Sequence, residues 1–323
     1  NLLHRIDYEK GTIELEGIEY PLLDTNFPTI DPKDPYTFTD QEADIMERLE
    51  RAFTNCDKLQ QHMKFLLAKG SLYKVYNNNL LYHGCVPLNE DGTFKEVEIY
   101  GKKYKGKALY DILDNYVRKG FVAMDREERE RGRDLMWYIW LHENSPLFGK
   151  DKMATFERYF LTEKETHKET KNPYYHFLEN EEVMDRILAE FGLAKEGAHI
   201  INGHVPVKSK DGESPIKCGG KLLVIDGGFS KAYQKETGIA GYTLIYNSYG
   251  LILAAHDPFE STEAAIENES DIHSDSKMVK WVPERKCVGD TDIGRELKEK
   301  IKDLEKLLEA YYTGTIAEKF TVQ

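Results

Sequence analysis

Two short segments of the chain share one design, and they constrain the fold more than any other feature. Residues 80–87 and 200–207 each have a short apolar run, then a histidine beside a glycine, then Val-Pro. A strand end holds such a histidine rigidly, and the glycine lets the backbone approach a ligand closely. Neutral imidazole is a good ligand for divalent transition metals. The pattern therefore indicates either two structural histidines or a metal site that includes His83 and His204.

Charge and cysteine content exclude several classes of protein. The net charge of −13 argues against a nucleic-acid partner, because a phosphate backbone requires a basic face. Four cysteines without a CxxC pair do not make a disulfide scaffold, which favours a cytoplasmic location. No apolar run approaches the ~20 residues of a membrane span, and we expect no signal peptide. The chain begins at Asn1 without an initiator Met, so we expect a processed product or a fragment.

The order of elements predicts a mixed α/β (α+β) fold. Residues 1–38 are expected to form short strands and a proline-containing linker, and residues 39–323 the main domain, with a helical insertion at about 107–192. Thr39 and Glu42 form a capping-box pattern in front of one helical stripe that Gly70 ends. Two further helices are expected at 108–119 and 127–141, with Gly120 as a C-cap between them, and two more at 179–191 and 295–312. Strands are expected at 80–82, 200–201, 222–225, 242–246, 251–255 and 278–282.

Long sequence blocks resemble a known family. His83-Gly84 and Gly203-His204 look like two signature blocks of the calcineurin-like metallophosphoesterases. The wider text resembles one branch, the class III fructose-1,6-bisphosphatases of Gram-positive and gut anaerobic bacteria. The blocks that carry this resemblance are LYHGCVP (81–87), NSPLFGK (144–150), MATFERYF (153–160), INGHVPV (201–207) and IDGGFS (225–230).

The resemblance implies a fold, a reaction and a metal. It implies part of the two-sheet metallophosphoesterase sandwich, with His83 and His204 each ligating one of two Mn²⁺ ions. The substrate would be a sugar bisphosphate, fructose 1,6-bisphosphate, whose 1-phosphate is hydrolysed in gluconeogenesis. In such two-metal sites the ions lie ~3.5–4 Å apart and activate a water for in-line attack.

Three blocks with which the family opens are absent from this sequence. They are an Asp-x-His, a Gly-Asp-x-x-Asp-Arg and a Gly-Asn-His-Asp/Glu block. Residues 289–295 (GDTDIGR) lack Asp before Arg and follow the last histidine block, so Asp290 or Thr291 is better interpreted as a helix N-cap. We therefore expect a C-terminal half whose partner is the upstream N-terminal half, and which is inactive alone because two histidines supply no bridging carboxylate.

The remaining candidates come from loops near these blocks. Arg158 is the candidate catalytic arginine, since a guanidinium grips phosphate bidentately, although a structural ion pair is an equal alternative. Lys152 and Lys208 are candidate substrate-binding residues, the latter for the second phosphate of the sugar. Asp226 is expected to form a tight turn that supports the site.

Hydrophobic and histidine residues outside these blocks receive structural interpretations. Core packing is expected for Trp137, Tyr138 and Trp140, and a structural role for His256 and His273 in polar loops. The apolar stripe of the terminal helix is expected to pack or to face a partner. The sequence leaves a homo-oligomer open.

Two other functions stay open from the sequence alone. Another calcineurin-like phosphoesterase would keep both histidines and change its specificity loops. A non-catalytic binding or regulatory domain would use the histidines only for packing.

Overall fold

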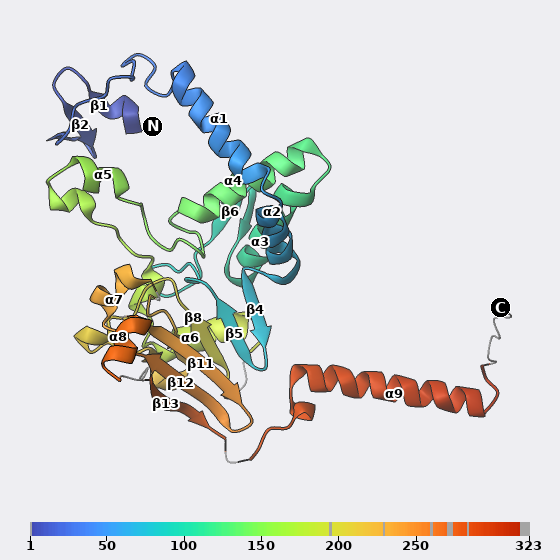
Figure 1. Cartoon of the computed structure of the whole chain (residues 1–323). Helices are drawn as coiled ribbons and strands as arrows, with labels where there is room; N and C mark the ends of the chain where they lie inside the picture. The colour runs from blue at the N-terminus through green and yellow to red at the C-terminus, as the bar shows by residue number, and fades with distance from the viewer. Residues whose placement is uncertain are drawn as a thin grey trace. The chain divides into compact units, whose positions relative to one another are not determined.

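The chain forms two compact units, each made of two separate stretches of sequence. The computed structural model describes residues 2–193, 196–228, 230–258, 261–269, 274–282 and 284–316. Unit 1 comprises Asn1–Leu72 and Pro87–Tyr175, and unit 2 comprises Tyr73–Val86 and His176–Gln323 (Figure 1). The boundaries of these units differ from those of the expected segments, 1–38 and 39–323. The division into those two segments stays a prediction.

Unit 1 begins with a small antiparallel sheet. Strands β1 (Ile6–Asp7), β2 (Thr12–Leu15) and β3 (Ile18–Pro21) pair in that order, after a 3₁₀ helix, η1 (Leu2–Arg5). The cluster that covers one face of this sheet contains Ile6, Ile13, Leu15, Leu22 and Leu161. The short strands expected around residues 6–22 are confirmed, because alternate apolar positions of β2 are buried.

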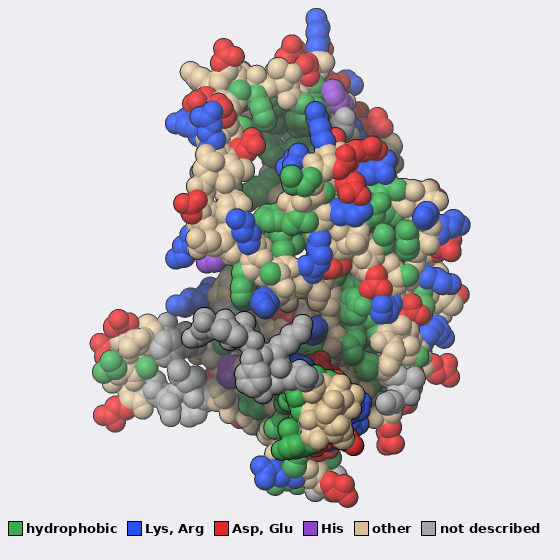
Figure 2. Space-filling view, turned by 90° about the vertical axis from the view of Figure 1, so that its right-hand side faces the viewer, with side chains coloured by type: hydrophobic (Ala, Val, Ile, Leu, Met, Phe, Trp, Pro, Cys, Tyr) green, Lys and Arg blue, Asp and Glu red, His purple; other side chains and the backbone are tan. Residues whose placement is uncertain are grey.

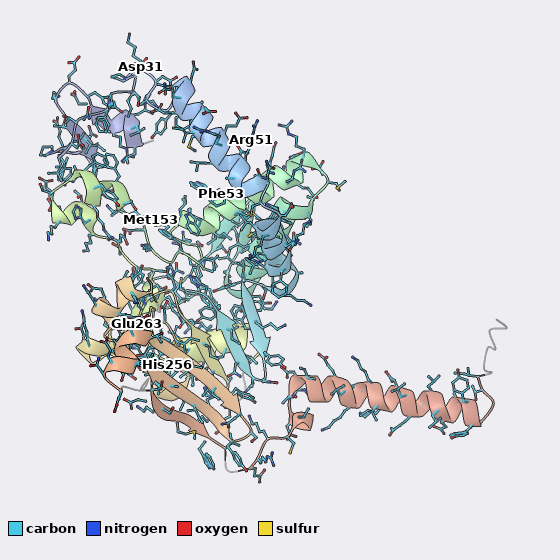
Figure 3. The ribbon with its side chains drawn as sticks, viewed as in Figure 1. Asp31, Arg51, Phe53, Met153, His256 and Glu263 are labelled. Carbon is cyan, nitrogen blue, oxygen red and sulfur yellow. The ribbon has the colours of Figure 1, made fainter. Side chains whose placement is uncertain are left out.

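Two helices replace the single stripe expected between Thr39 and Gly70. Helix α1 (Asp40–Thr54) starts at the predicted capping box of Thr39 and Glu42, and α2 (Asp57–Lys69) ends at Gly70 as predicted. Asn55 is the C-cap of α1 and Asp57 begins α2, in agreement with the preference of Asn and Asp for helix ends over helix interiors. No residue of either helix is buried in the described structure; Phe53, labelled near the end of α1 in Figure 3, is 64% exposed.

A pair of long helices forms the core of unit 1 beside the hairpin of β6 (Val97–Ile99) and β7 (Lys102–Tyr104). Helix α3 (Gly106–Val122) runs through Gly120, so the predicted C-cap at Gly120 is wrong. Gly120 is buried there against Gly132 of α4 (Arg126–Leu141): a Cβ on Gly120 would lie 2.8 Å from the carbonyl carbon of Gly132. The glycine at position 120 therefore permits a close helix crossing.

The central sheet of unit 2 has the strand order β4-β5-β8-β10-β9. Strands β4 (Tyr73–Tyr76) and β5 (Asn79–Tyr82) form a hairpin. Strand β5 pairs in parallel with β8 (His199–Asn202), and β8 pairs in parallel with β10 (Leu222–Val224); β9 (Ile216–Lys217) is an antiparallel edge strand. The chain between β5 and β8 includes a stretch of unit 1 and helix α6 (Glu181–Glu190) of unit 2.

A second sheet packs against the first to make a sandwich within unit 2. Strands β11 (Gly241–Asn247), β12 (Gly250–His256) and β13 (Ser274–Trp281) are antiparallel. The strands predicted at 242–246 and 251–255 are confirmed, and they form the β11–β12 hairpin. Ile201 of β8, Leu223 of β10 and Leu251 of β12 form the apolar core that joins the two sheets. The predicted mixture of α and β structure is thus confirmed.

The remaining helices of unit 2 are short except for the last. They are α7 (Lys231–Thr237), α8 (Thr262–Glu267) and α9 (Asp292–Tyr312); α5 (Thr155–Phe160) belongs to unit 1. Thr291 is the N-cap of α9, as predicted, and accepts a hydrogen bond from the Gly294 amide. Asp292 and Asn77, in the β4–β5 turn, exchange two hydrogen bonds of 2.7 and 3.0 Å, which hold the start of α9 to the central sheet.

The surface carries both signs of charge, and Figure 2 shows Lys and Arg side chains interspersed with Asp and Glu side chains on the face displayed. Among the helices of the described residues, none is both long enough and apolar enough to cross a membrane.

Candidate functional site

Three parallel strands of unit 2 end at one edge of the central sheet, and a polar residue follows each of them. His83 follows β5, His204 follows β8 after a glycine, and Asp226 follows β10. Because parallel strands present their carboxyl ends at the same edge, residues that are far apart in sequence meet there. This edge is the candidate site.

Backbone and side-chain hydrogen bonds fix the three strand ends to one another. The Gly203 amide donates to the His83 carbonyl oxygen at 2.9 Å, and the Val207 amide donates to the Asp226 carbonyl oxygen at 2.7 Å. The buried Asn202 side chain donates from Nδ2 to the Gly84 carbonyl oxygen, also at 2.9 Å. These bonds continue the sheet past its last strand pairs and make the edge rigid.

The two predicted metal-binding histidines are in direct contact. His83 Nε2 lies 2.9 Å from His204 Nδ1, and the ring centroids are 4.8 Å apart with an interplanar angle of 63°. One ring must carry the shared proton and the other must accept it, so the pair is joined by a hydrogen bond between imidazoles. The structure therefore confirms that the two matching segments meet.

The backbone of His204 is unusual. Its φ is +69°, in the left-handed region that residues other than glycine rarely adopt. Such a conformation costs of order 1–3 kcal/mol and persists where surrounding contacts enforce it. Here the adjoining Gly203 bond to His83 and the turn closed by Val205 on Gly203 (2.8 Å) hold it in place.

The surroundings of His83 favour the neutral form of its imidazole. Partial desolvation by neighbouring protein atoms lowers the pKa of His83, although its side chain reaches solvent, and His204 lowers it further. The carboxylate of Asp226 acts in the opposite direction and raises this pKa. Since only neutral imidazole ligates a metal, the net lowering favours the ligand form near neutral pH.

Asp226 forms the tight turn that the sequence predicts. Its Oδ1 accepts a hydrogen bond of 3.0 Å from the Gly228 amide. A Cβ atom added to Gly203 would lie 3.6 Å from Asp226 Oδ2, so the carboxylate lies beside the segment that contains His204. Asp226 thus shapes the site and adds negative charge to it.

Arg158 and Lys152 lie in unit 1. Arg158 is on α5 and pairs with Glu169 (Nη2–Oε1 3.3 Å), which is the structural role that the sequence left open beside phosphate binding. Glu169 also binds Lys150 at 2.6 Å and the Ala154 amide at 3.0 Å. Catalysis by Arg158 and substrate binding by Lys152 stay predictions.

Lys208 lies in unit 2, directly after the segment that contains His204. Its side chain is exposed, and its backbone amide donates to Glu213 Oε2 at 3.0 Å. The preceding residue, Val207, is the one bonded to Asp226, so the backbone at Lys208 is tied to the candidate edge. Its role in binding a phosphate stays a prediction.

Two further interpretations are settled by the structure. Trp137 and Trp140 are 66% and 67% exposed, so core packing is wrong for them, because both lie on the face of α4 away from the buried Leu135 and Ile139. His256 ends strand β12, so its expected place in a polar loop is wrong. Its ring bonds Thr243 and Ser274 at 2.7 and 2.8 Å, in agreement with the expected structural role. His273 lies outside the described residues.

Two polar residues were not predicted to matter. Asn202 joins the two histidine segments through its hydrogen bond to Gly84. In the sequence it is recognisable as the polar residue that ends the apolar run of residues 200–201. Glu169 pairs with both Lys150 and Arg158 in unit 1, and its charged surroundings in the sequence give no comparable signal. In the part of the chain that the structure describes, no group of three or more His, Cys, Asp or Glu side chains is placed to hold a metal ion.

The donor set fits part of a metal site. At bonds of about 2.1 Å, two imidazole nitrogens on one ion at roughly 90° are about 3 Å apart. The 2.9 Å between His83 Nε2 and His204 Nδ1 matches that spacing. Mn²⁺ also favours oxygen ligands, which this pair does not supply. The two histidines therefore suit two positions of a larger ligand set.

Comparisons with known proteins show the family of the chain. The family model described as Firmicute fructose-1,6-bisphosphatase matches residues 1–313. A protein of Clostridium novyi (strain NT) named "Fructose-1,6-bisphosphatase class 3" is 57% identical over 319 residues, covering 98% of this chain and 48% of the relative. Proteins of the same name from Bacteroides fragilis (strain YCH46) and Clostridioides difficile (strain 630) are 56% and 57% identical, with the same coverage.

The chain spans about half the length of these curated relatives. The expectation of a C-terminal half stays a prediction. No solved structure matches the chain. A match of the family model over nearly the whole chain, together with relatives more than half identical, shows that the chain belongs to the Firmicute fructose-1,6-bisphosphatase family.

Proposed function

We propose that this chain supplies His83 and His204 to the metal centre of a phosphatase that hydrolyses the 1-phosphate of fructose 1,6-bisphosphate. The observation that carries the proposal is the 2.9 Å approach of the two imidazoles at the carboxyl edge of three parallel strands. Membership of the family supports the reaction, since its curated members are named for that activity.

The metal we propose is Mn²⁺, and both histidines would bind the same ion. The sequence-based expectation placed one histidine on each of two ions, but their spacing favours a shared one. A bound divalent ion would supply Lewis-acid polarisation of a phosphoryl oxygen. The chain's own contribution is to hold two neutral nitrogen donors rigidly through the Gly203 and Asn202 hydrogen bonds. Oxygen ligands from the rest of a full-length protein would complete the site.

Three cations are proposed to bind the substrate. Arg158 would bind the reacting phosphate, for which it would have to exchange its ion pair with Glu169. Lys152 would assist it, and Lys208 would bind the second phosphate of the sugar. We also propose a cytoplasmic location, because the four cysteines, all within the described residues, form no disulfide.

A metal titration tests the ligand assignment. In a protein of the relatives' full length, Mn²⁺ binding followed by electron paramagnetic resonance should weaken at least about 10–100-fold in His83→Ala and in His204→Ala. His256→Ala is the matched control, since that ring bonds only the second sheet in the described structure. Unchanged Mn²⁺ affinity in the double variant His83→Ala/His204→Ala would show that the histidines are structural.

Product release tests the reaction. Phosphate release from fructose 1,6-bisphosphate should depend on Mn²⁺ and should exceed release from a phosphopeptide. Preference for the phosphopeptide would indicate another phosphoesterase of the same superfamily. Robust Mn²⁺-dependent release by residues 1–323 alone would contradict the idea that the chain holds only part of the site.

A further inference from the structure

Helix α9 carries an apolar stripe that nothing in the described structure covers. Gly294 is the only buried residue of the helix, all of whose residues are described. The side chains of the stripe are 42–63% exposed: Leu297, Ile301, Leu304, Leu307, Leu308 and Tyr311. Exposed apolar rows of this length mark sites of association, because water contact with them is unfavourable.

The spacing of the stripe is that of a coiled-coil seam. Leu297, Ile301, Leu304, Leu308 and Tyr311 follow one another at intervals of four, three, four and three. Such a seven-residue pattern keeps one side of a helix facing a single partner helix along its length. A partner helix of similar pattern is therefore the natural cover.

A second copy of α9 fits this seam when it runs in the opposite direction. If Ile301 of one copy lies opposite Leu304 of the partner subunit, Leu297 lies opposite the partner's Leu308. The layers then repeat symmetrically about the middle of the helix, as a two-fold axis requires. Every layer from Leu297 to Leu308 is filled by one aliphatic residue from each copy.

Charges that border the seam support the same alignment. Lys298 and Glu305 occupy equivalent positions one heptad apart. Lys298 Nζ donates to the Gly289 carbonyl oxygen at 2.9 Å in the described structure. In the antiparallel pair, Lys298 would exchange this bond for a contact with Glu305 of the partner subunit, and the symmetry would make that contact twice. Pairs at such flanking positions set partner choice and orientation.

The two ends of α9 also suit antiparallel pairing. Gly294 continues the heptad but is covered by 3₁₀ helix η6 (Val288–Asp290), because a Cβ on Gly294 would collide with the Val288 backbone. Val288 itself is 69% exposed at this end of the stripe. Antiparallel pairing places the partner's Tyr311 near Val288, whereas parallel pairing would place Tyr311 opposite the partner's Tyr311 and leave Val288 without Tyr311 as a neighbour.

We propose that α9 mediates an antiparallel homodimer of this chain, with Leu297, Ile301, Leu304 and Leu308 at its centre and Lys298–Glu305 contacts at its borders. This surface is independent of the histidine site. The hydrogen bonds between Asp292 and Asn77 would fix the dimer helix to the central sheet.

The test is the oligomeric state of the 323-residue chain, measured by sedimentation equilibrium from about 1 to 100 μM. We expect a dimer whose dissociation constant rises at least about 100-fold in Leu304→Glu, because the charge enters an apolar layer. Circular dichroism checks that the variant stays folded, as expected for a residue that is already 63% exposed. A monomer at all concentrations, or a dimer that survives Leu304→Glu, would overturn the proposal.

Charge reversal tests the direction of pairing. Glu305→Lys should weaken the dimer about tenfold, and Lys298→Glu/Glu305→Lys should restore it. A parallel pair would instead bring Lys300 close to Glu305, so rescue by Lys300→Glu/Glu305→Lys alone would refute the antiparallel arrangement. Glu299→Lys is the matched control, because it makes the same charge change on the opposite side of the helix. Masking of the stripe only in a longer protein, without dimerisation, would show that another segment covers it.

Discussion

Replacement of Gly132 by alanine should destabilise unit 1, although the same change stabilises most helices. Alanine in a helix interior is favoured over glycine by about 1 kcal/mol. A Cβ on Gly132, however, would collide with the backbone nitrogen and Cα of Gly120 and lie 2.5 Å from the Tyr116 carbonyl oxygen. These atoms belong to the backbone of α3 and cannot rotate away, so the two helices would have to separate.

The expected cost exceeds the gain in helix propensity. Overpacking a tight contact costs typically 1–3 kcal/mol, and a separation of 0.5–1 Å removes about a quarter to a half of the dispersion energy between facing atoms. The core that the helices share with β6 includes Leu109, Leu113, Leu135 and Ile139, all nearly fully buried. We therefore expect a net loss of about 2 kcal/mol or more.

Urea unfolding followed by circular dichroism, with hydrogen exchange of α4 amides to report on unit 1, measures this loss. A loss of this size lowers the urea midpoint by about 1 M at an m value of about 2 kcal/mol/M. Arg133→Ala, at the exposed neighbouring position of α4, is the control and should change stability by less than about 0.5 kcal/mol. A Gly132→Ala protein that is more stable than the wild type would refute the close crossing of α3 and α4.

Three further predictions concern polar groups, two of which are buried. Asn172→Ala should cost about 2–4 kcal/mol in urea unfolding, because its Oδ1 accepts from the Leu88 and Tyr174 amides in a buried position. Burial lowers the pKa of His199 in the folded chain. As the pH drops below about 6.5, His199 therefore binds a proton more readily in the unfolded chain, and the free energy of unfolding falls. His199→Asn should reduce this loss of stability at low pH. If the free energy of unfolding of the variant keeps the pH dependence of the wild type, other groups cause the loss. Asp226→Asn should lower the pKa of His83, since the carboxylate raises it while Asn keeps the acceptor for Gly228; a rise in an NMR titration would contradict the electrostatic role of Asp226.

The features that the sequence predicted correctly depend on short stretches of chain. Thr39 and Glu42 form their capping box, and Thr291 caps α9, because each bond spans only three residues. The meeting of His83 and His204 was also predictable, since parallel strands that end in similar segments place those ends at one edge.

The features that were missed depend on contacts between distant elements. Gly120 has the appearance of a helix stop until Gly132, on another helix, is known to touch it. The apolar character of Trp137 and Trp140 indicates burial, but the orientation of α4 turns them outward. A structural ion pair was an open alternative for Arg158, but the sequence did not identify Glu169 as its partner.

The interleaving of the two units has a consequence for synthesis on the ribosome. His204 is made 121 residues after His83, a delay of roughly 6–24 s at about 5–20 residues per second. During that interval β5 has β4 as its neighbour but lacks β8, and an isolated hairpin is only marginally stable in water. Strand β5, an inner strand of the sheet, can thus pair with other segments during this interval, and the histidine pair can assemble only after residue 204 has been made. Slow codons or a chaperone acting between residues 83 and 204 would therefore affect the yield of this protein more than the same intervention after residue 226.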